Sequence, residues 1–342
     1  MVFFVKLMRT SKNDVCTHQT VVQFVIIWYN SIIILYYHKR GKINMSFKQN
    51  RSLSFVIVAV VYVLATVLGI VLCNVLPYDT WLNILIADVL ATVFVFAFSV
   101  VLGNASIYDP YWSVQPMVIA VALLVSQKHF TLYNVLLLAV VLLWGIRLTA
   151  NWAYTFGNLT CQDWRYTMLK QKTKGFYPII NFVGIHMVPT LVVYGCCLPI
   201  IFAMQTSIEI TLDNIHCLVF LAVSLGAVVL QCASDIQMHK FRKDKREGLT
   251  TEPFMRRGLW KHSRHPNYLA EILMWWGVGL SGAVILPNSW FVIIGAVANT
   301  LLFTFVSIPM ADGRQSRKDG FATYKAETFA LLPLPKPHHK AK

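Results

Sequence analysis

Apolar residues along the chain are collected into long runs, and short polar segments separate these runs. A helix needs about 20 residues to cross a bilayer, and runs near that length lie at residues 53–73, 82–102, 114–126, 131–150, 176–204, 215–236, 267–286 and 289–309. The third run is short and the fifth is long. The pattern predicts an all-α fold, a polytopic membrane bundle of about eight transmembrane helices.

Composition and charge placement agree with a membrane protein. Hydrophobic residues make up 56% of the 342 residues and charged residues 13%, which excludes an ordinary soluble domain. Three of the 30 Lys and Arg residues precede Lys39. When the runs alternate through a bilayer, all the others lie on one side of the membrane except Lys128. The positive-inside rule then predicts that both termini are cytoplasmic.

The same placement bears on partners and location. Because topology explains the net charge of +15, we expect a lipid bilayer as partner and no nucleic acid. The membrane would be the endoplasmic reticulum in a eukaryote or the inner membrane in a bacterium. The sequence carries no signal for an oligomeric state.

The N-terminal segment differs from the rest of the chain. Its apolar run at residues 21–37 contains polar residues, and no small-residue cleavage site follows it. It fits a weak ninth span, an interfacial segment, or an extension outside the working protein, and we favour the extension for residues 1–50. We expect a single membrane domain over residues 51–335 and a basic tail at 336–342.

Cysteine usage predicts neither a metal site nor a disulfide framework. The seven cysteines include no CxxC pair and no histidine at zinc-like spacing, and most lie inside apolar runs. There they act as small apolar side chains.

A dense polar segment directly precedes the seventh apolar run. It contains several cations before the start of a predicted helix, where phosphate binds well: Arg256, Arg257, Lys261 and Arg264. Pro266 suits the first turn of that helix. Asn267 and Glu271 follow at i and i+4, on one face. Ionisable groups at a membrane boundary favour a functional site.

Two more segments bring polar groups to the same side of the predicted membrane. The sixth run ends in Gln231, Asp235, His239 and Arg242. Asp235 fits a ligand-facing role, or an i, i+4 pair with His239 that caps the helix. Together with residues after the last run, this set suits an amphipathic anion: arginines for phosphates, and amides and carboxylates for hydroxyl groups and a carboxamide.

Two other segments allow more than one interpretation. Residues 108–116, between the second and third runs, disfavour helix and predict an ordered aromatic elbow. This elbow is either an interfacial anchor or a functional site, and Asp109 has no obvious cationic partner in the sequence. In the fifth run, prolines surround His186, for which we favour helix kinks and a hydrogen-bonded core histidine. Asp163 and Arg165 are expected to pair with each other or with groups of the last loop.

Several separated motifs resemble the steroid 5α-reductase C-terminal superfamily, in the same order. They are Gly258-Leu-Trp260, Ser263-Arg-His-Pro-Asn-Tyr268, Glu271, Trp275-Trp-Gly277 and the spaced residues from Ile308 to Pro333. The resemblance covers about residues 80–335. It is greatest to the uncharacterised bacterial and protist steroid reductase-like membrane proteins, in which segments similar to Asp109–Ser113 and Asp163–Tyr166 also occur.

This resemblance implies an NADPH site. The superfamily includes NADPH-dependent steroid and sterol reductases as well as isoprenylcysteine carboxyl methyltransferases. It implies that the cofactor contacts Asp235, Arg242, Asn267, Tyr268, Glu271, Arg314 and Tyr324. We also expect Arg264 and His265 of the same polar segment to bind the cofactor. The sequence departs from the usual pattern at Gln231, Ala270 and Asp312. No motif identifies the N-terminal Glu and Tyr pair of the steroid reductases.

The leading hypothesis is NADPH-dependent reduction of an enone-type carbon–carbon double bond in a lipophilic steroid, sterol or other lipid. A neutral tyrosine that is hydrogen-bonded to a carboxylate would supply the proton without leaving a charge stranded in an apolar site. Tyr111 and Tyr108 beside Asp109 are the candidates, with Tyr166 behind them. The alternatives are S-adenosylmethionine-dependent methyl transfer and non-catalytic lipid binding. The many arginines favour NADPH, because S-adenosylmethionine has no phosphates.

Overall fold

The computed structural model describes residues 46–334, and the predictions for residues 1–45 and 335–342 lie outside the described range. Within it, seven helical stretches are long and apolar enough to cross a membrane. Their helices are α4 (Arg51–Val75), α5 (Thr80–Leu102), α7 (Leu132–Thr155), α8 (Trp164–Thr173) continuing through α9 (Tyr177–Ile179) into α10 (Val188–Ala203), α11 (His216–Arg246), α13 (Pro266–Ile285), and α14 (Ile294–Leu302) continuing into α15 (Ile308–Gln315). The third predicted run forms α6 (Tyr111–Gln127), which has only 17 residues. The predicted all-α membrane bundle is confirmed.

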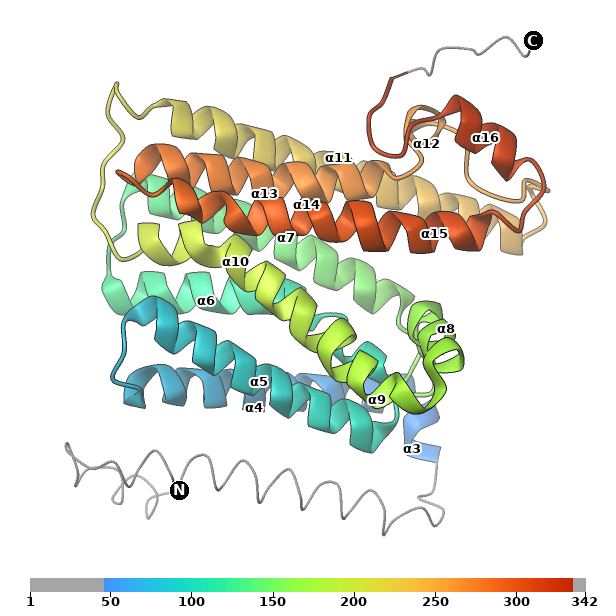
Figure 1. Cartoon of the computed structure of the whole chain (residues 1–342), viewed down its shortest axis with the longest axis horizontal. Coiled ribbons are helices and arrows are strands. Elements are labelled where there is room, and N and C mark those ends of the chain that lie inside the picture. The colour runs from blue at the N-terminus through green and yellow to red at the C-terminus, as the bar shows by residue number, and fades with distance from the viewer. Residues whose placement is uncertain (1–45, 335–342) are drawn as a thin grey trace.

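The helices run back and forth, so the bundle has two ends (Figure 1). Short elements gather at one end: α3 (Ser46–Gln49), η1 (Ala105–Tyr108), α8, α12 (Leu259–His262) and α16 (Phe321–Glu327). The loops at the other end contain a single cation among the described residues, Lys128. The two ends therefore differ in charge as the positive-inside rule requires, and the cytoplasmic position of the basic end stays a prediction.

Two spanning stretches change their hydrogen-bond register just before a proline. In η3 (Ile180–Met187) the chain is a π-helix, and the Val188 amide donates to the Val183 carbonyl, five residues earlier. The same register occurs in η5 (Phe303–Ser307), directly before Pro309. Proline lacks an N–H and clashes with the preceding turn, so a local π-turn relieves both problems. In the fifth run this register change precedes Pro189, and the expected kinks stay a prediction.

Small residues allow the central helices to approach closely. On α13, a Cβ at Gly277 would lie 2.1 Å from Oγ of Ser224 on α11. Between α10 and α14, a Cβ at Gly295 would lie 2.0 Å from the backbone nitrogen of Cys196. Helices in a bilayer associate largely through such close packing. These contacts fix the position of α13, which carries Asn267 and Glu271.

We therefore expect Gly295→Ala to destabilise the bundle, because the added methyl group meets backbone atoms that cannot rotate away. The free energy of unfolding should fall by about 1–3 kcal/mol, visible as a lower melting temperature of the detergent-purified protein. Gly226→Ala on α11 is the matched control, since no atom lies within 4 Å of its Cβ position. Equal melting temperatures for both variants would contradict this packing.

Candidate functional site

A tyrosine–carboxylate pair connects α5 and α6 inside the bundle. The Tyr111 hydroxyl donates to Oδ1 of Asp88 at 2.7 Å, and Nε2 of Gln115 donates to Oδ2 at 2.9 Å. All three side chains are buried. Each carboxylate oxygen thus has a hydrogen-bond donor, which makes an acidic residue tolerable inside a spanning helix.

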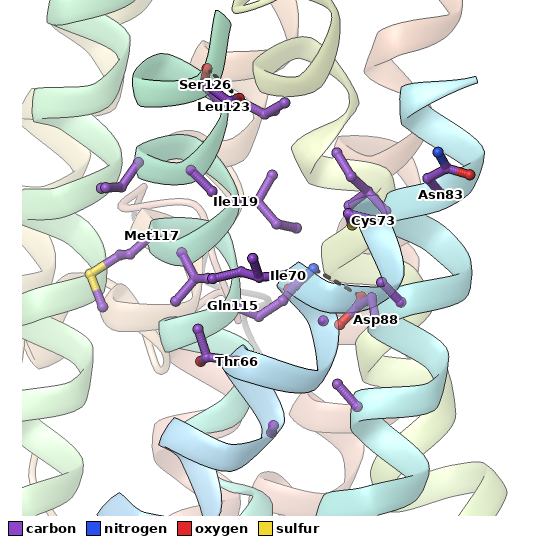
Figure 2. Close-up of a pocket in the computed structure, with 18 of the residues that line it drawn as sticks. Thr66, Ile70, Cys73, Asn83, Asp88, Gln115, Met117, Ile119, Leu123 and Ser126 are labelled. Atoms are coloured by element: carbon purple, nitrogen blue, oxygen red, sulfur yellow. Dashed lines mark hydrogen bonds between the residues drawn. The ribbon is translucent and has the colours of Figure 1, made fainter. Parts of the chain in front are cut away.

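This pair lines a large cavity between α4, α5 and α6, and Figure 2 shows Asp88 and Gln115 joined by a hydrogen bond among the lining residues. The cavity has a volume of about 820 Å³, which is within the usual range for ligand sites. Most of its lining is apolar, with members such as Ile70, Ile119 and Leu123. An apolar chamber with a few convergent polar groups is the usual form of a small-molecule site.

The three predicted catalytic residues lie next to one another, but with different partners from those expected. Tyr108 stacks on Tyr111 at 5.4 Å between ring centroids, and its hydroxyl bonds with Thr190 at 2.7 Å. Asp109 accepts a hydrogen bond from Tyr166 on α8. The carboxylate beside Tyr111 is Asp88, which the sequence reasoning missed. An aspartate inside a predicted span was the signal that could have identified it.

His186 lies behind Tyr108 as a buried histidine. Its ring centroid is 4.6 Å from that of Tyr108, and Nδ1 lies 2.9 Å from the Asn181 carbonyl oxygen. Nε2 is buried without a hydrogen-bond partner among the described residues. The hydrogen-bonded core position agrees with the favoured interpretation of the sequence.

A second polar cluster occupies the basic end of α7, α11 and α13. Glu271 is buried and accepts hydrogen bonds from Trp144 at 2.9 Å, from Trp275 at 3.0 Å and from Gln231. One turn further along α11, Asp235 pairs with Arg147 of α7 at 2.5 Å. Asp235 therefore has a cation from another helix as its partner.

Several polar atoms of this cluster are buried without a partner within residues 46–334. They are Nε and Nη2 of Arg147, Oε1 of Gln231 and Oδ1 of Asn267. Unpartnered buried polar atoms are rare in folded proteins and need an explanation. The set offers both donors and acceptors, which is what a carboxamide or a hydroxyl group of a bound molecule would require.

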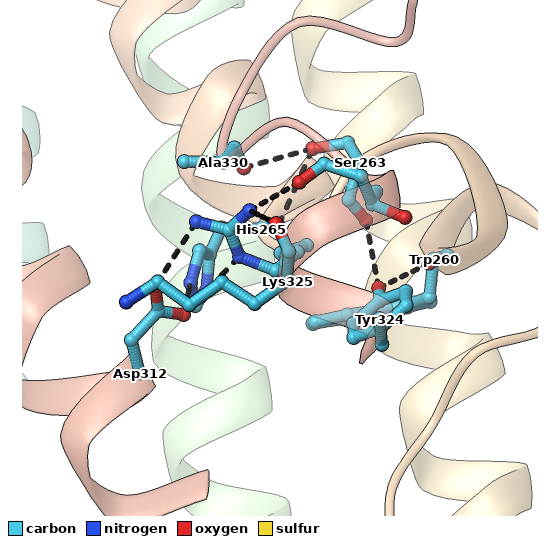
Figure 3. Close-up of polar contacts among 9 residues, drawn as sticks. Trp260, Ser263, His265, Asp312, Tyr324, Lys325 and Ala330 are labelled. Atoms are coloured by element: carbon cyan, nitrogen blue, oxygen red, sulfur yellow. Dashed lines mark hydrogen bonds and ion pairs between the residues drawn. The ribbon is translucent and has the colours of Figure 1, made fainter. Parts of the chain in front are cut away.

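Other predicted cofactor residues are engaged with the protein itself (Figure 3). The buried Arg264 guanidinium pairs with Asp312 at 3.0 Å, and Nε2 of His265 lies 2.9 Å from the same carboxylate. The Tyr324 hydroxyl donates to the Trp260 carbonyl oxygen, and burial raises the pKa of Tyr324 to about 12. These contacts fasten the polar loop and the C-terminal segment to α15. The cofactor roles of these residues stay predictions.

The remaining predicted arginines differ in whether they have an ion-pair partner. Arg242, at the end of α11, and Arg314, on α15, are exposed and have no ion-pair partner in the described part of the chain. The Arg314 guanidinium lies 4.5 Å from the centroid of a Trp164 ring. By contrast, Arg256 and Arg257 both pair with Glu252.

Helix α8 and a row of indole rings connect the two polar regions. Arg314 contacts Trp164 at the start of α8, and Tyr166 two residues later reaches Asp109 in the elbow. Asp163 and Arg165 pair with each other at 2.8 Å, as expected. Inside the bundle, Trp112, Trp144 and Trp275 follow one another with centroid distances of 6.4 and 4.8 Å. Tyr268 lies beside this region, with its ring stacked on His265 at 5.0 Å.

Comparison with known proteins places the chain in a family. The family model described as "Protein of unknown function (DUF1295)" matches residues 95–328, and the chain belongs to this family. The matched segment includes Tyr111 and Glu271, and Asp88 lies just before it. The uncharacterized protein C594.04c of Schizosaccharomyces pombe is 26% identical over 201 residues, which is 53% of this chain and 58% of the yeast protein. The chain thus matches less than two thirds of that relative's length. No solved structure matches the chain.

Asp109 in the elbow should make the stability of the protein depend on pH. Burial raises the pKa of the Asp109 carboxyl to about 6, although the charge of Arg165 and the Tyr166 hydrogen bond act in the opposite direction. Ionised Asp109 therefore costs stability, and this cost develops as pH rises from the ordinary carboxyl range to about 6. Asp109→Asn should raise the melting temperature at about pH 8, with a gain that shrinks as pH falls below about 6.

The control for this experiment is Asp213→Asn, because Asp213 is exposed in the loop between α10 and α11. It should leave the pH dependence of melting unchanged. A stability gain in Asp109→Asn that is the same at every pH would contradict the argument.

Proposed function

We propose that this protein is an NADPH-dependent reductase of a carbon–carbon double bond conjugated to a carbonyl group in a steroid, sterol or other lipid. We further propose that it belongs to the wider group of steroid 5α-reductase-like enzymes. The supporting observation is the Tyr111–Asp88 hydrogen bond at the polar end of an otherwise apolar cavity. A hydroxyl in that position is suited to a substrate that is apolar except for a carbonyl oxygen.

In this proposal Tyr111 is the proton donor. On substrate binding its hydroxyl would turn from Asp88 to the substrate carbonyl, and a protonated Asp88 carboxyl would then donate to the tyrosine oxygen, the reverse of the hydrogen bond in the structure without substrate. Gln115 holds the other carboxyl oxygen, so the orientation of Asp88 is fixed. NADPH, when bound, would supply a hydride to the β-carbon. Tyr111 would give its proton to the carbonyl oxygen and regain one from Asp88, and the resulting enol would tautomerise to the saturated ketone with a proton exchanged with solvent. Proton donation by a positioned side chain typically contributes about a hundredfold or more to the rate.

The cofactor would be held by the polar cluster at the basic end of the bundle. The unpartnered atoms of Arg147, Gln231 and Asn267 fit a carboxamide or hydroxyl groups. Arg242 and Arg314 are the exposed arginines suited to phosphates. The aromatic row from Trp275 to Trp112 runs from this cluster to the residue next to Tyr111. The proposal requires the nicotinamide to reach the cavity beside this row.

A specific observation favours a second candidate, methyl transfer from S-adenosylmethionine. Arg264 is committed to Asp312, and Arg256 and Arg257 are committed to Glu252. Fewer arginines are therefore available for phosphates than the sequence implies. S-adenosylmethionine carries hydroxyl groups, an amine and a carboxylate but no phosphate, and the polar cluster could also bind these groups.

Nucleotide binding to the purified protein separates the two candidates. We expect NADPH to bind, and Arg242→Gln and Arg314→Gln to weaken it by about tenfold each, since each removes about one charged hydrogen bond. Arg246→Gln, at the exposed end of α11, is the control and should bind NADPH normally. Binding of S-adenosylmethionine without NADPH would overturn the reductase proposal.

Removal of one hydroxyl group tests the chemistry. Tyr111→Phe keeps the ring that packs against Tyr108 and Tyr62 but removes the proposed donor. NADPH consumption with lipophilic enones should fall by about a hundredfold or more, while the Kd for NADPH should not change. Tyr154→Phe, on the exposed face of α7, is the control. Full activity in Tyr111→Phe would exclude this residue as the donor.

A further inference from the structure

The length of the cavity indicates how long its ligand is. Residues of α6 line it from Tyr111 to Gln127, which at 1.5 Å per residue corresponds to about 24 Å. The hydrocarbon core of a bilayer is about 30 Å thick. The lining residues therefore extend along most of a membrane-spanning distance beside α6, as a groove that is partly open along its side. A rigid four-ring nucleus is much shorter and would leave a large part of this length unfilled.

The two ends of the cavity differ in chemistry. Asp88, Tyr111 and Gln115 form a buried polar end, and the middle is apolar. Asn74 and Gln127 also line the cavity, and they lie at the ends of α4 and α6 next to the loops of the non-basic end of the bundle. A molecule with one polar head and a long apolar chain matches this order.

One atom at the polar end is suited to a ligand with a donor group. Oε1 of Gln115 is buried and has no hydrogen-bond partner among the described residues, whereas Nε2 donates to Asp88. An acceptor of this kind is satisfied by a hydroxyl or an amide N–H. The head group would then donate a hydrogen bond to Gln115, and its carbonyl would accept one from Tyr111 once that hydroxyl turns from Asp88 to the ligand.

The mouth of the cavity is bordered by exposed apolar side chains on two helices. Ile70 on α4 and Val121 and Val125 on α6 line the cavity, and each is itself exposed. Helix α4 packs on α5, whereas α6 packs on α7 and α10. In a membrane these exposed side chains face acyl chains, so the opening between α4 and α6 leads into the bilayer.

We infer that the cavity binds a single-chain lipid that enters from the bilayer between α4 and α6. Its carbonyl-bearing head lies at Asp88, Tyr111 and Gln115, and its chain extends along α6 toward Asn74 and Gln127. The inference rests on the proposed function only for the place of the reacting carbonyl at Tyr111. It narrows the proposed substrates from lipids in general to extended, single-chain ones.

Photolabelling of the full-length protein in lipid nanodiscs tests this orientation. The probe is hexadecanamide, whose carbonyl accepts and whose N–H donates, with a diazirine either at the chain end or beside the amide. The chain-end probe should label residues 70–74 and 118–127, and the head probe should label residues 62–66 and 111–115. Label scattered over the lipid-facing surfaces of all helices would overturn the inference.

A matched pair of variants separates a long site from a short one. Ala122→Trp places an indole ring in the far half of the cavity, and Ala139→Trp places one on the exposed face of α7 as the control. Ala122→Trp should reduce labelling by the hexadecanamide chain-end probe about tenfold, equivalent to about 1.4 kcal/mol. It should leave labelling by a butanamide head probe unchanged, and the control should change neither. Equal loss in both variants, or no loss, would contradict an extended occupant.

Competition between unlabelled ligands tests whether the site prefers a chain or a ring system. NADPH oxidation separates failure of the lipid site from failure of the proposed reductase. Unlabelled hexadecanamide should suppress the label at lower concentration than a four-ring steroid ketone, and the reverse order would overturn the inference. Specific labelling without enone-dependent NADPH oxidation would refute the reductase and leave the lipid site. Tyr111-dependent oxidation with scattered labelling would refute the lipid site and leave the reductase.

Discussion

The structure depends on one constraint: an ionisable group inside a bilayer must find its hydrogen-bond partners within the protein. The buried acids of the bundle follow this rule. Asp88 receives hydrogen bonds from Tyr111 and Gln115, and Glu271 receives three donors from neighbouring helices. Against this background, the buried polar atoms that lack partners stand out. Several lie beside Glu271 and one lies at Gln115, the two places where a ligand is proposed, and others such as Nε2 of His186 lie elsewhere in the bundle.

The same constraint links the two regions. The buried Trp144 indole satisfies Glu271 and also packs against Trp112, the neighbour of Tyr111. Helix α8 makes a second connection outside the core, because Trp164 contacts Arg314 and Tyr166 bonds with Asp109. Packed aromatic rings thus form a continuous row between the polar cluster and the end of the cavity. Shared side chains of this kind are expected where a cofactor and a substrate must be positioned against each other.

The sequence predicted features that depend on local pattern. Hydrophobic run length predicted the spanning helices, Pro266 marked the start of α13, and Asp163 pairs with Arg165 two residues away. Pairings across long sequence separations were not predictable. Tyr111 and Asp88 are 23 residues apart on separate helices, and Arg264 meets Asp312 across 48 residues. Periodicity shows which face of a helix is polar, but the packing of helices decides which side chain satisfies it.

The folded structure leaves fewer arginines available to the proposed cofactor than the sequence suggests. In the sequence, every arginine near the polar loop counts as a candidate for binding phosphate. In the folded protein, a buried arginine such as Arg264 must be paired, and removal of its carboxylate partner would leave a charge without compensation. Only exposed cations remain available to an anionic ligand at low cost. The groups available to a phosphate-bearing cofactor are therefore Arg242, Arg314 and the unpartnered atoms of the polar cluster. The total number of arginines does not indicate such a cofactor.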